Sequence, residues 1–118
     1  MEKTKLSNIK YNKDGLVPVL VQEDSTNEIL MFAYSNQEAI KLTLEKKLAH
    51  FWSRSRNELW LKGHTSGNYL KIKQVLIDCD NDSLVYKVDL NENKACHTGS
   101  KTCFYKELTY EWNSSLQN

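Results

Sequence analysis

The sequence predicts an α+β fold: a strand-rich single domain with one main helix. At 118 residues the chain has the length of one ordinary domain, and a hydrophobic content of 40% is enough to form a core. Most apolar segments are short and rich in β-branched or aromatic residues, and only one repeats its apolar residues at helical spacing. Because no repeat or low-complexity linker divides the sequence, we expect one domain over residues 1–118, with a loose polar tail at 113–118.

Residues 16–22 and 29–34 are the first two predicted strands, joined by a polar turn. Pro18 restricts the first strand to an edge position or places the proline at the strand start, because proline lacks the N–H that a central strand donates. The stretch SNQE at 35–38 has the form of a capping box, and apolar residues recur at helical spacing after it. This pattern predicts the one helix, which should end near Lys47.

The remainder of the chain contains five further segments with strand-like composition, separated by polar links. These segments are residues 49–53, 58–62, 69–78, 83–90 and 103–112. We therefore expect a β-rich architecture with the helix on one side of it.

The 16 basic and 15 acidic residues nearly cancel, which leaves a formal charge of +1. No global field therefore favours nucleic acid or an anionic membrane as a partner. No apolar run approaches the ~18 residues that a membrane-spanning helix needs, and the N-terminal MEKTKLSNIK lacks the apolar core of a secretion signal. Three cysteines without a C-x-x-C pair suit a reduced compartment. We expect a soluble, cytoplasmic protein that binds neither nucleic acid nor membrane.

The stretch IDCDND, residues 77–82, places three carboxylates and a thiol in five consecutive positions. If its backbone is extended, Asp78, Asp80 and Asp82 line one face and Cys79 points to the other. Carboxylates are the hard ligands that Mg²⁺ or Ca²⁺ prefers, whereas a thiolate suits Zn²⁺. An EF-hand loop is a poor match, since serine stands where that loop needs glycine. The alternative is a well-solvated acidic hairpin tip.

Two further cysteines, Cys96 and Cys103, lie seven residues apart across a loop that contains Gly99. They could chelate one ion if that loop folds back, and Cys79 would make a third ligand. Three thiolates leave a tetrahedral zinc with one open position, as catalytic zinc sites do. His97 could be a fourth ligand, which would close the site, or a supporting or general-base group beside it. The alternative is that the cysteines are small buried hydrophobes.

Two polar stretches have the composition of phosphate-binding segments. In WSRSR, residues 52–56, Arg54 and Arg56 alternate with hydroxyl side chains, and guanidinium groups recognise phosphate through paired hydrogen bonds. In GHTSGN, residues 63–68, glycines flank a threonine and Ser66, so that backbone N–H groups can turn toward an anion, although the P-loop pattern is absent. Exposed polar turns are the alternative for both stretches.

Taken together and in order, three segments resemble the phosphoribosyl-AMP cyclohydrolases of histidine biosynthesis. They are MFAYSNQEAIKLTLEKKLAHFWSRSRNELWLKGHTSGN, LIDCDNDSLVYKV and ACHTGSKTCFY. The resemblance extends from about residue 13 to residue 105, and the W-S-R-S-R, D-C-D-x-D and C-H-T-G-x-x-x-C motifs occur together in few other settings. His64 occupies a variable position of the family's G-x-T-S-G loop, so the resemblance implies no catalytic role for it.

The resemblance implies a zinc- and magnesium-dependent homodimer with an α+β, strand-rich fold. Its activity would be hydrolysis of the bond between N1 and C6 of the adenine ring of 1-(5-phosphoribosyl)-AMP, which gives the formimino carboxamide ribotide. The residues that match the family's magnesium ligands are Asp78, Asp80 and Asp82. Those that match its zinc ligands, with one zinc per subunit held where two subunits meet, are Cys79, Cys96 and Cys103.

The same reaction suggests roles for polar residues outside the metal ligands. His97 is our candidate for moving the proton. Arg54 and Arg56 are candidates for holding a phosphate of the substrate, and Ser66 is a candidate for a further substrate contact.

Two other classes of protein fit parts of the sequence. A zinc-stabilised RNA-binding module would hold a closed zinc site and contact RNA through its arginines, but it predicts a broad basic face, which the near-neutral charge disfavours. A zinc-dependent nucleoside deaminase would carry the H-x-E…P-C-x-x-C signature, which this sequence lacks. The cyclohydrolase is therefore the function that we expect.

Overall fold

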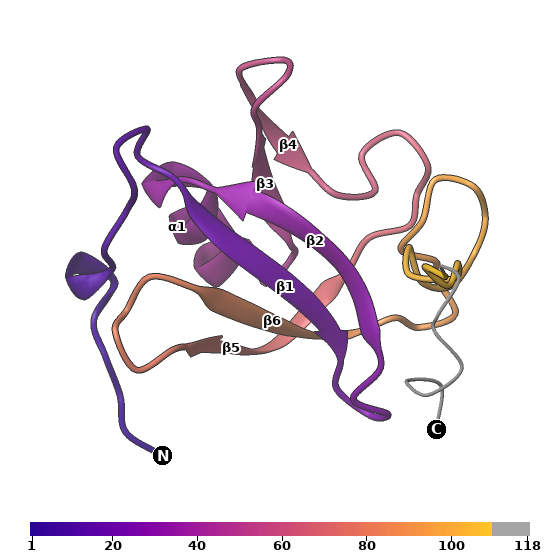
Figure 1. The fold of residues 1–118 in the computed structure, drawn as a ribbon, viewed down its shortest axis with the longest axis horizontal. Coiled ribbons are helices and arrows are strands. Elements are labelled where there is room, and N and C mark those ends of the chain that lie inside the picture. Colours follow the sequence, from indigo (N-terminus) through magenta and orange to yellow (C-terminus); the bar gives the residue numbers. More distant parts are fainter. Residues whose placement is uncertain (110–118) are drawn as a thin grey trace, which may run out of the picture.

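The computed structural model describes residues 1–109, and the tail predicted at 113–118 lies outside the described residues. Within them, one α-helix accompanies a strand-rich architecture, which confirms the α+β prediction (Figure 1). The elements in chain order are a 3-10 helix at Leu6–Asn8, β1 (Val17–Glu23), β2 (Ile29–Ser35), α1 (Gln37–Lys46), β3 (His50–Ser53), β4 (Glu58–Leu61), β5 (Lys71–Ile77) and β6 (Leu84–Asp89).

The six strands form one sheet in the order β4-β3-β2-β1-β6-β5. Among the strands of residues 1–109, only β1 and β6 pair in parallel, and the chain between them, which forms β2 to β5 and α1, is the long crossover that a parallel pair needs. Pro18 is the second residue of β1, and the pairing with β6 begins at Val19, so no parallel ladder bond needs the missing N–H. The expectation of proline at a strand start is confirmed.

The sheet curls so that the start of β3 and the start of β5 come into contact. An isolated antiparallel bridge joins Leu48, just before β3, to Lys71, the first residue of β5. Backbone hydrogen bonds from Ala49 to Leu70 and from Ile72 to Lys47 extend this contact. The ends of β3 and β5 are therefore held together although the two strands are not neighbours in the sheet order.

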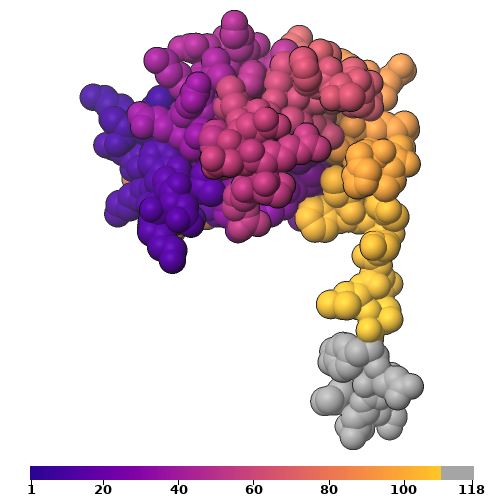
Figure 2. Space-filling view, turned by 90° about the horizontal axis from the view of Figure 1, so that it is seen from above, coloured from indigo at the N-terminus to yellow at the C-terminus, as the bar shows by residue number. Residues whose placement is uncertain are grey.

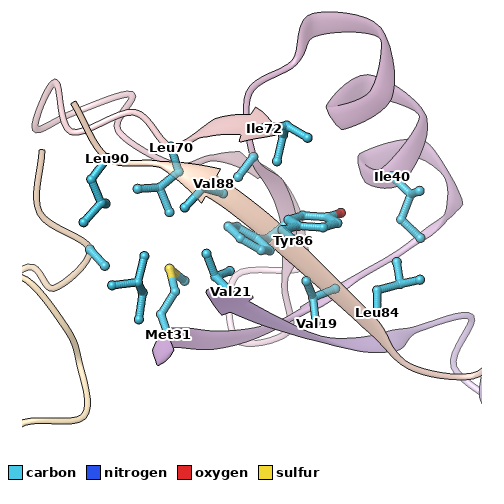
Figure 3. Packing of buried hydrophobic residues seen from close by; sticks show 14 of the residues in the cluster. Val19, Val21, Met31, Ile40, Leu70, Ile72, Leu84, Tyr86, Val88 and Leu90 are labelled. Carbon is cyan, nitrogen blue, oxygen red and sulfur yellow. The ribbon is translucent and has the colours of Figure 1, made fainter. Parts of the chain in front are cut away.

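The core fills the inside of this curl (Figure 3). Val19 and Val21 of β1 alternate inward, as a strand with one buried face does, and Tyr86 of β6 is fully buried with its ring 5.6 Å from that of Phe51. Ile40 of α1 closes one end of the core. Within residues 1–109, the helices are too short or too polar to cross a lipid bilayer.

Three details of the predicted elements are wrong. Asn36, not Ser35, caps α1 by accepting a hydrogen bond from the N–H of Ala39 at 2.9 Å, because Ser35 is the buried last residue of β2. The short 3-10 helix carries no signal that we recognised. No strand forms over 103–109 of the segment predicted at 103–112, whose last three residues lie outside the described part of the chain.

Candidate functional site

The acidic stretch forms the tip of the β5–β6 hairpin. β5 ends at Ile77, so residues 78–83 form a turn and not the extended strand that we predicted. One carboxylate oxygen of Asp78 accepts hydrogen bonds from the N–H groups of Asp82 (2.9 Å) and Ser83 (3.2 Å), and Asn81 has φ 65°. The three aspartates converge, as expected, but because the turn folds them together and not because side chains alternate along a strand.

One oxygen from each of Asp78, Asp80 and Asp82 lies within 4.8 Å of the others, and all three residues are exposed. The N–H of Asp82 stabilises the Asp78 carboxylate and holds its pKa below the ordinary value. The neighbouring Asp80 and Asp78 carboxyl groups raise the pKa of Asp82. Three hard oxygen ligands that repel one another, with room for water around them, fit a magnesium ion.

The second half of the candidate site is the loop from Cys96 to Cys103. Its backbone folds back on itself, which is the condition under which both thiols could reach one ion: the N–H of Cys96 donates to the carbonyl of Ser100 at 3.2 Å, and Gly99 has φ 92°. The end of the loop is tied to β2, because the N–H of Cys103 donates to the carbonyl of Leu30 at 2.7 Å. The two thiols lie side by side as a result.

The two thiols differ in acidity. Cys96 Sγ lies 2.9 Å from the hydroxyl oxygen of Thr98, and this hydrogen bond lowers the pKa of Cys96. Desolvation raises the pKa of Cys103, and the adjacent Cys96 thiol adds to the effect. Ionisation of one thiol therefore disfavours ionisation of the other, and a cation bound between them would favour both thiolates. Neighbouring thiols of this kind fit zinc.

Cys79 is not part of this pair in the same chain. It lies exposed in the turn before β6, whereas Cys96 and Cys103 follow the other end of that strand (Figure 1). Six residues of strand separate the two ends by roughly 20 Å at about 3.3 Å per residue. Within residues 1–109, the only group of three His, Cys, Asp or Glu side chains close enough to share an ion is the aspartate group.

Two adjoining cavities open beside the thiol pair. One, of about 330 Å³, is lined by Cys103, His97, Lys62, Trp60 and apolar side chains that include Phe104. The other, of about 300 Å³, shares Trp60, Lys62 and His97 with the first and adds Cys96 and Ser66. His97 therefore faces the space next to both thiols. A larger cavity of about 660 Å³ at the N-terminus of α1 contains none of the predicted site residues.

The two arginines have different surroundings. The Arg54 guanidinium stacks over the ring of Tyr34, with its carbon 4.0 Å from the ring centroid, and lines a separate cavity of about 610 Å³ together with Trp60. The Arg56 side chain is 77% exposed, reaches Glu58 at 3.9 Å and lines none of these cavities. The alternation in W-S-R-S-R thus puts only one of the two guanidinium groups beside the candidate site.

Ser66 and His64, two residues of the same loop, also differ in their position relative to the thiol cavities. Ser66 lines the cavity that contains Cys96, whereas the exposed His64 lines neither thiol cavity. Trp60 and Lys62 line both cavities, although neither was among the predicted site residues. A signal was present: they are two residues apart at the end of a predicted strand, so their side chains share a face, and a lysine there follows an apolar run.

Comparison with known protein families and relatives gives the same family throughout. The family model described as phosphoribosyl-AMP cyclohydrolase matches residues 31–105. A phosphoribosyl-AMP cyclohydrolase of Archaeoglobus fulgidus is 51% identical over 100 residues, which cover 85% of this chain and 92% of the relative. One of Chlorobium chlorochromatii is 49% identical over 119 residues, covering 99% and 85%. The histidine biosynthesis bifunctional protein HisIE of Aquifex aeolicus is 47% identical over 85% of this chain, which spans about half (49%) of that relative's length.

Proposed function

The chain belongs to the phosphoribosyl-AMP cyclohydrolase family of histidine biosynthesis, and on this premise we propose that it opens the adenine ring of 1-(5-phosphoribosyl)-AMP at the N1–C6 bond with the help of zinc and magnesium. The observation that carries the proposal is the placement of His97 and two adjacent thiols at cavities large enough for a purine ring. The family relationship favours this enzyme over an RNA-binding module.

The proposed zinc ligands are Cys96 and Cys103 of one subunit and Cys79 of a second subunit. The first two thiols lie together, and β6 keeps Cys79 of the same chain away from them, so a three-thiol site requires a homodimer. A bound zinc would supply Lewis acidity, which makes water a stronger nucleophile near neutral pH. The soft thiolate ligands suit this ion better than magnesium.

His97 is the proposed proton carrier. The reaction adds water across the N1–C6 bond: the oxygen bonds to C6, the N1–C6 bond breaks, and one proton of the water moves to the nitrogen that leaves. His97 lines both cavities and follows Cys96 directly, so its imidazole can take that proton and return it without leaving the site.

Asp78, Asp80 and Asp82 are the proposed magnesium ligands, because their oxygens already converge. A magnesium ion there would neutralise the charge of a substrate phosphate. In the proposed dimer, the acidic turn lies beside the partner's thiol pair, because it carries Cys79. The turn then supplies ligands for both metals, although it is not the two-faced strand that we expected.

The substrate carries two phosphates. Arg54 is the proposed contact for one of them, because its guanidinium lines the cavity that adjoins the thiol cavities through Trp60. Arg56 is a weaker candidate because of its exposure and its contact with Glu58. Ser66 is a proposed substrate contact at the other end of the site. We place the enzyme in the cytoplasm, where the three free cysteines stay reduced.

The direct test is incubation of the purified protein with phosphoribosyl-AMP while the ring-opened product is followed by its absorbance. We expect turnover that a strong chelator abolishes and that zinc restores. Full turnover in a preparation shown by elemental analysis to contain no transition metal would contradict the zinc proposal, and no turnover in the zinc-loaded protein would contradict the proposed function itself.

A further inference from the structure

We propose that Lys62 binds a phosphate of the substrate, in a pocket that it forms with the loop of residues 63–68 and that is separate from the Arg54 cavity. This pocket is the cavity of about 300 Å³ described above. The inference rests on the proposed function for the identity of the molecule that carries the phosphate. The binding of inorganic phosphate itself can be tested without it.

The first argument is the environment of Lys62. Its residue surface is only 8% exposed, yet within residues 1–109 its ammonium group makes no hydrogen bond or salt bridge. Its nearest aromatic contact is weak, with the nitrogen 5.8 Å from the centre of the Trp60 ring. No acidic residue lines either cavity that Lys62 faces. The side chain of Lys62 is therefore largely removed from water while its ammonium group reaches the two cavities, where the Cys96 and Cys103 thiols are its nearest potential anions. A partly desolvated cation at a cavity wall favours a bound anion, which would offset its remaining desolvation cost.

The second argument is the supply of hydrogen-bond donors in the loop. Ser66 Oγ accepts the N–H of Asn68 at 3.2 Å, which leaves the serine hydroxyl proton free to donate. The side-chain oxygen Oδ1 of Asn68 accepts the N–H of Lys94 at 3.2 Å. The NH₂ group of the same side chain is therefore left to donate to another acceptor. Both residues line the pocket, as does Thr65. Phosphate is an acceptor and matches a pocket of donors.

The third argument is that the loop is built to hold one shape. Gly63 has φ 94°, and a Cβ at this position would lie 2.5 Å from the backbone nitrogen of Tyr69, so no larger residue fits there without a shift. The N–H of Gly67 donates to the carbonyl of Gly63 at 2.8 Å and closes the loop. The donors around Lys62 are therefore held in place before an anion arrives, which lowers the entropy cost of binding.

The pocket also has the right neighbours. It shares Trp60, Lys62 and His97 with the Cys103 cavity, which in turn shares Phe32 and Trp60 with the Arg54 cavity. The three cavities are therefore neighbours in a row: Arg54 lines the cavity at one end, Cys103 lines the middle one and Cys96 lines the one at the other end, and Lys62 and His97 line the last two. A substrate with two phosphates flanking a purine fits this order: one phosphate at Lys62, the other at Arg54, and the ring beside Cys103 and His97.

The competing role for Lys62 is to balance the charge of the two zinc-binding thiolates beside it. The two roles predict different losses in the Lys62→Met variant: a phosphate contact predicts weaker substrate binding, and charge balance predicts weaker zinc binding. Methionine keeps most of the stem and removes the charge. We expect KM for phosphoribosyl-AMP to rise about 10- to 100-fold, the usual range for a lost charge-assisted hydrogen bond, while zinc content stays at the wild-type level and kcat changes less than about threefold.

Lys62→Arg should recover part of the loss, because a guanidinium also binds phosphate. Lys94→Met is the matched control: it removes the same charge from an exposed lysine of the neighbouring segment, which lines none of the three cavities, and should leave KM unchanged. An unchanged KM in Lys62→Met, or a loss of zinc that accounts for its lost activity, overturns the proposal.

A measurement on the wild-type protein applies even if Lys62→Met does not fold. Inorganic phosphate is titrated into the zinc-loaded protein while backbone amide resonances are followed by NMR. We expect saturable shifts at residues 62–68. Shifts confined to the Arg54 region, or none at all, overturn the proposal. Because this titration needs no turnover, it separates a failure of the Lys62 pocket from a failure of the proposed enzymatic function.

Discussion

Cys103 is exposed as a residue, but partial desolvation of its thiol and the adjacent Cys96 raise its pKa. A metal ion must therefore displace its proton, which sulfur coordination to zinc does and a serine hydroxyl does not. We predict that Cys103→Ser lowers zinc affinity at least about 100-fold, since even outer partners of a metal site are worth 10- to 100-fold, and abolishes turnover. Elemental analysis of the purified variant checks this, and a wild-type zinc content would remove Cys103 from the ligand set.

Asp80 tests the other metal. Asp80→Asn keeps the size of the side chain and removes one of three converging charges, so we predict that about tenfold or more magnesium is needed for half-maximal activity. Zinc should stay bound, because Cys79 is not a member of the carboxylate group. The check is a magnesium titration of activity together with zinc analysis. Lost zinc with an unchanged magnesium requirement would contradict the assignment.

Arg54 and Arg56 form a natural pair of variant and control. Arg54→Ala should raise KM about 10- to 100-fold through the loss of a charge-assisted phosphate contact. Arg56→Ala removes an equal charge from a residue that is 77% exposed and outside the cavity, and we predict a change in KM of less than about threefold. Steady-state kinetics of both variants measure the two KM values. A larger rise in KM for Arg56→Ala than for Arg54→Ala would contradict the choice of Arg54 as the phosphate contact.

At the scale of elements, the loop that carries Cys96 and Cys103 is tethered to the β1–β2 hairpin. The Lys101 ammonium lies 2.7 Å from Glu23 and 2.9 Å from Glu28, and the Thr102 hydroxyl donates to the carbonyl of Ile29 at 2.8 Å. These contacts fix the thiol pair against the start of β2. The position of the proposed zinc ligands Cys96 and Cys103 therefore depends on an ion-pair cluster of residues that are not themselves proposed ligands.

We predict that Lys101→Met lowers the thermal unfolding midpoint. Hydrogen bonding to Lys101 lowers the pKa of Glu23, so this part of the stabilisation is complete above its ordinary value of 4.5 and is lost as pH falls below it. Bonding to Glu23 raises the pKa of Lys101, so its part is complete below 10.5 and is lost as pH rises above that. Unfolding of both proteins at pH 3, 7 and 12 checks this: the difference should be largest at pH 7, and an equal difference at all three would contradict it.

Most of the strands and the helix could be predicted from the sequence, and the reason is physical. Strands β1 and β6 bury alternate residues, and α1 buries Ala39, Ile40 and Thr43; burial imposes the periodicity that predicts these elements. Residues 103–109 have strand composition but no strand forms there, because Phe104 lines the cavity beside Cys103 and its N–H donates to the Thr102 side chain. The turn at 78–83 depends on hydrogen bonds between the Asp78 carboxylate and the backbone of the same turn, and the position of Lys62 beside the thiol pair depends on contacts between distant segments. Composition reveals neither.

At the scale of the whole molecule, apolar side chains are exposed around the thiol pair. Phe32, Phe104 and Tyr105 are 48%, 58% and 52% exposed, and the first two line the Cys103 cavity together. Residues 100–109 extend from this end of the molecule, yellow in Figure 2. An exposed apolar group of this kind is typical of an interface, and the proposed dimer would cover it while bringing in the partner's acidic turn.

The proposed dimer predicts that two inactive variants repair each other. If Cys79 comes from one chain and Cys96 with Cys103 from its partner, a Cys79→Ala chain paired with a Cys103→Ala chain contains one intact zinc site and one with both lesions. Random pairing of equal amounts makes about half of the dimers mixed, and one of two sites in each is whole.

The measurement is cyclohydrolase activity after the two variants are unfolded together and refolded with zinc, compared with each refolded alone. We predict about a quarter of the wild-type activity from the mixture and none from either variant alone. Activity near zero in a mixture whose mixed dimers are seen by mass spectrometry would contradict the shared zinc site.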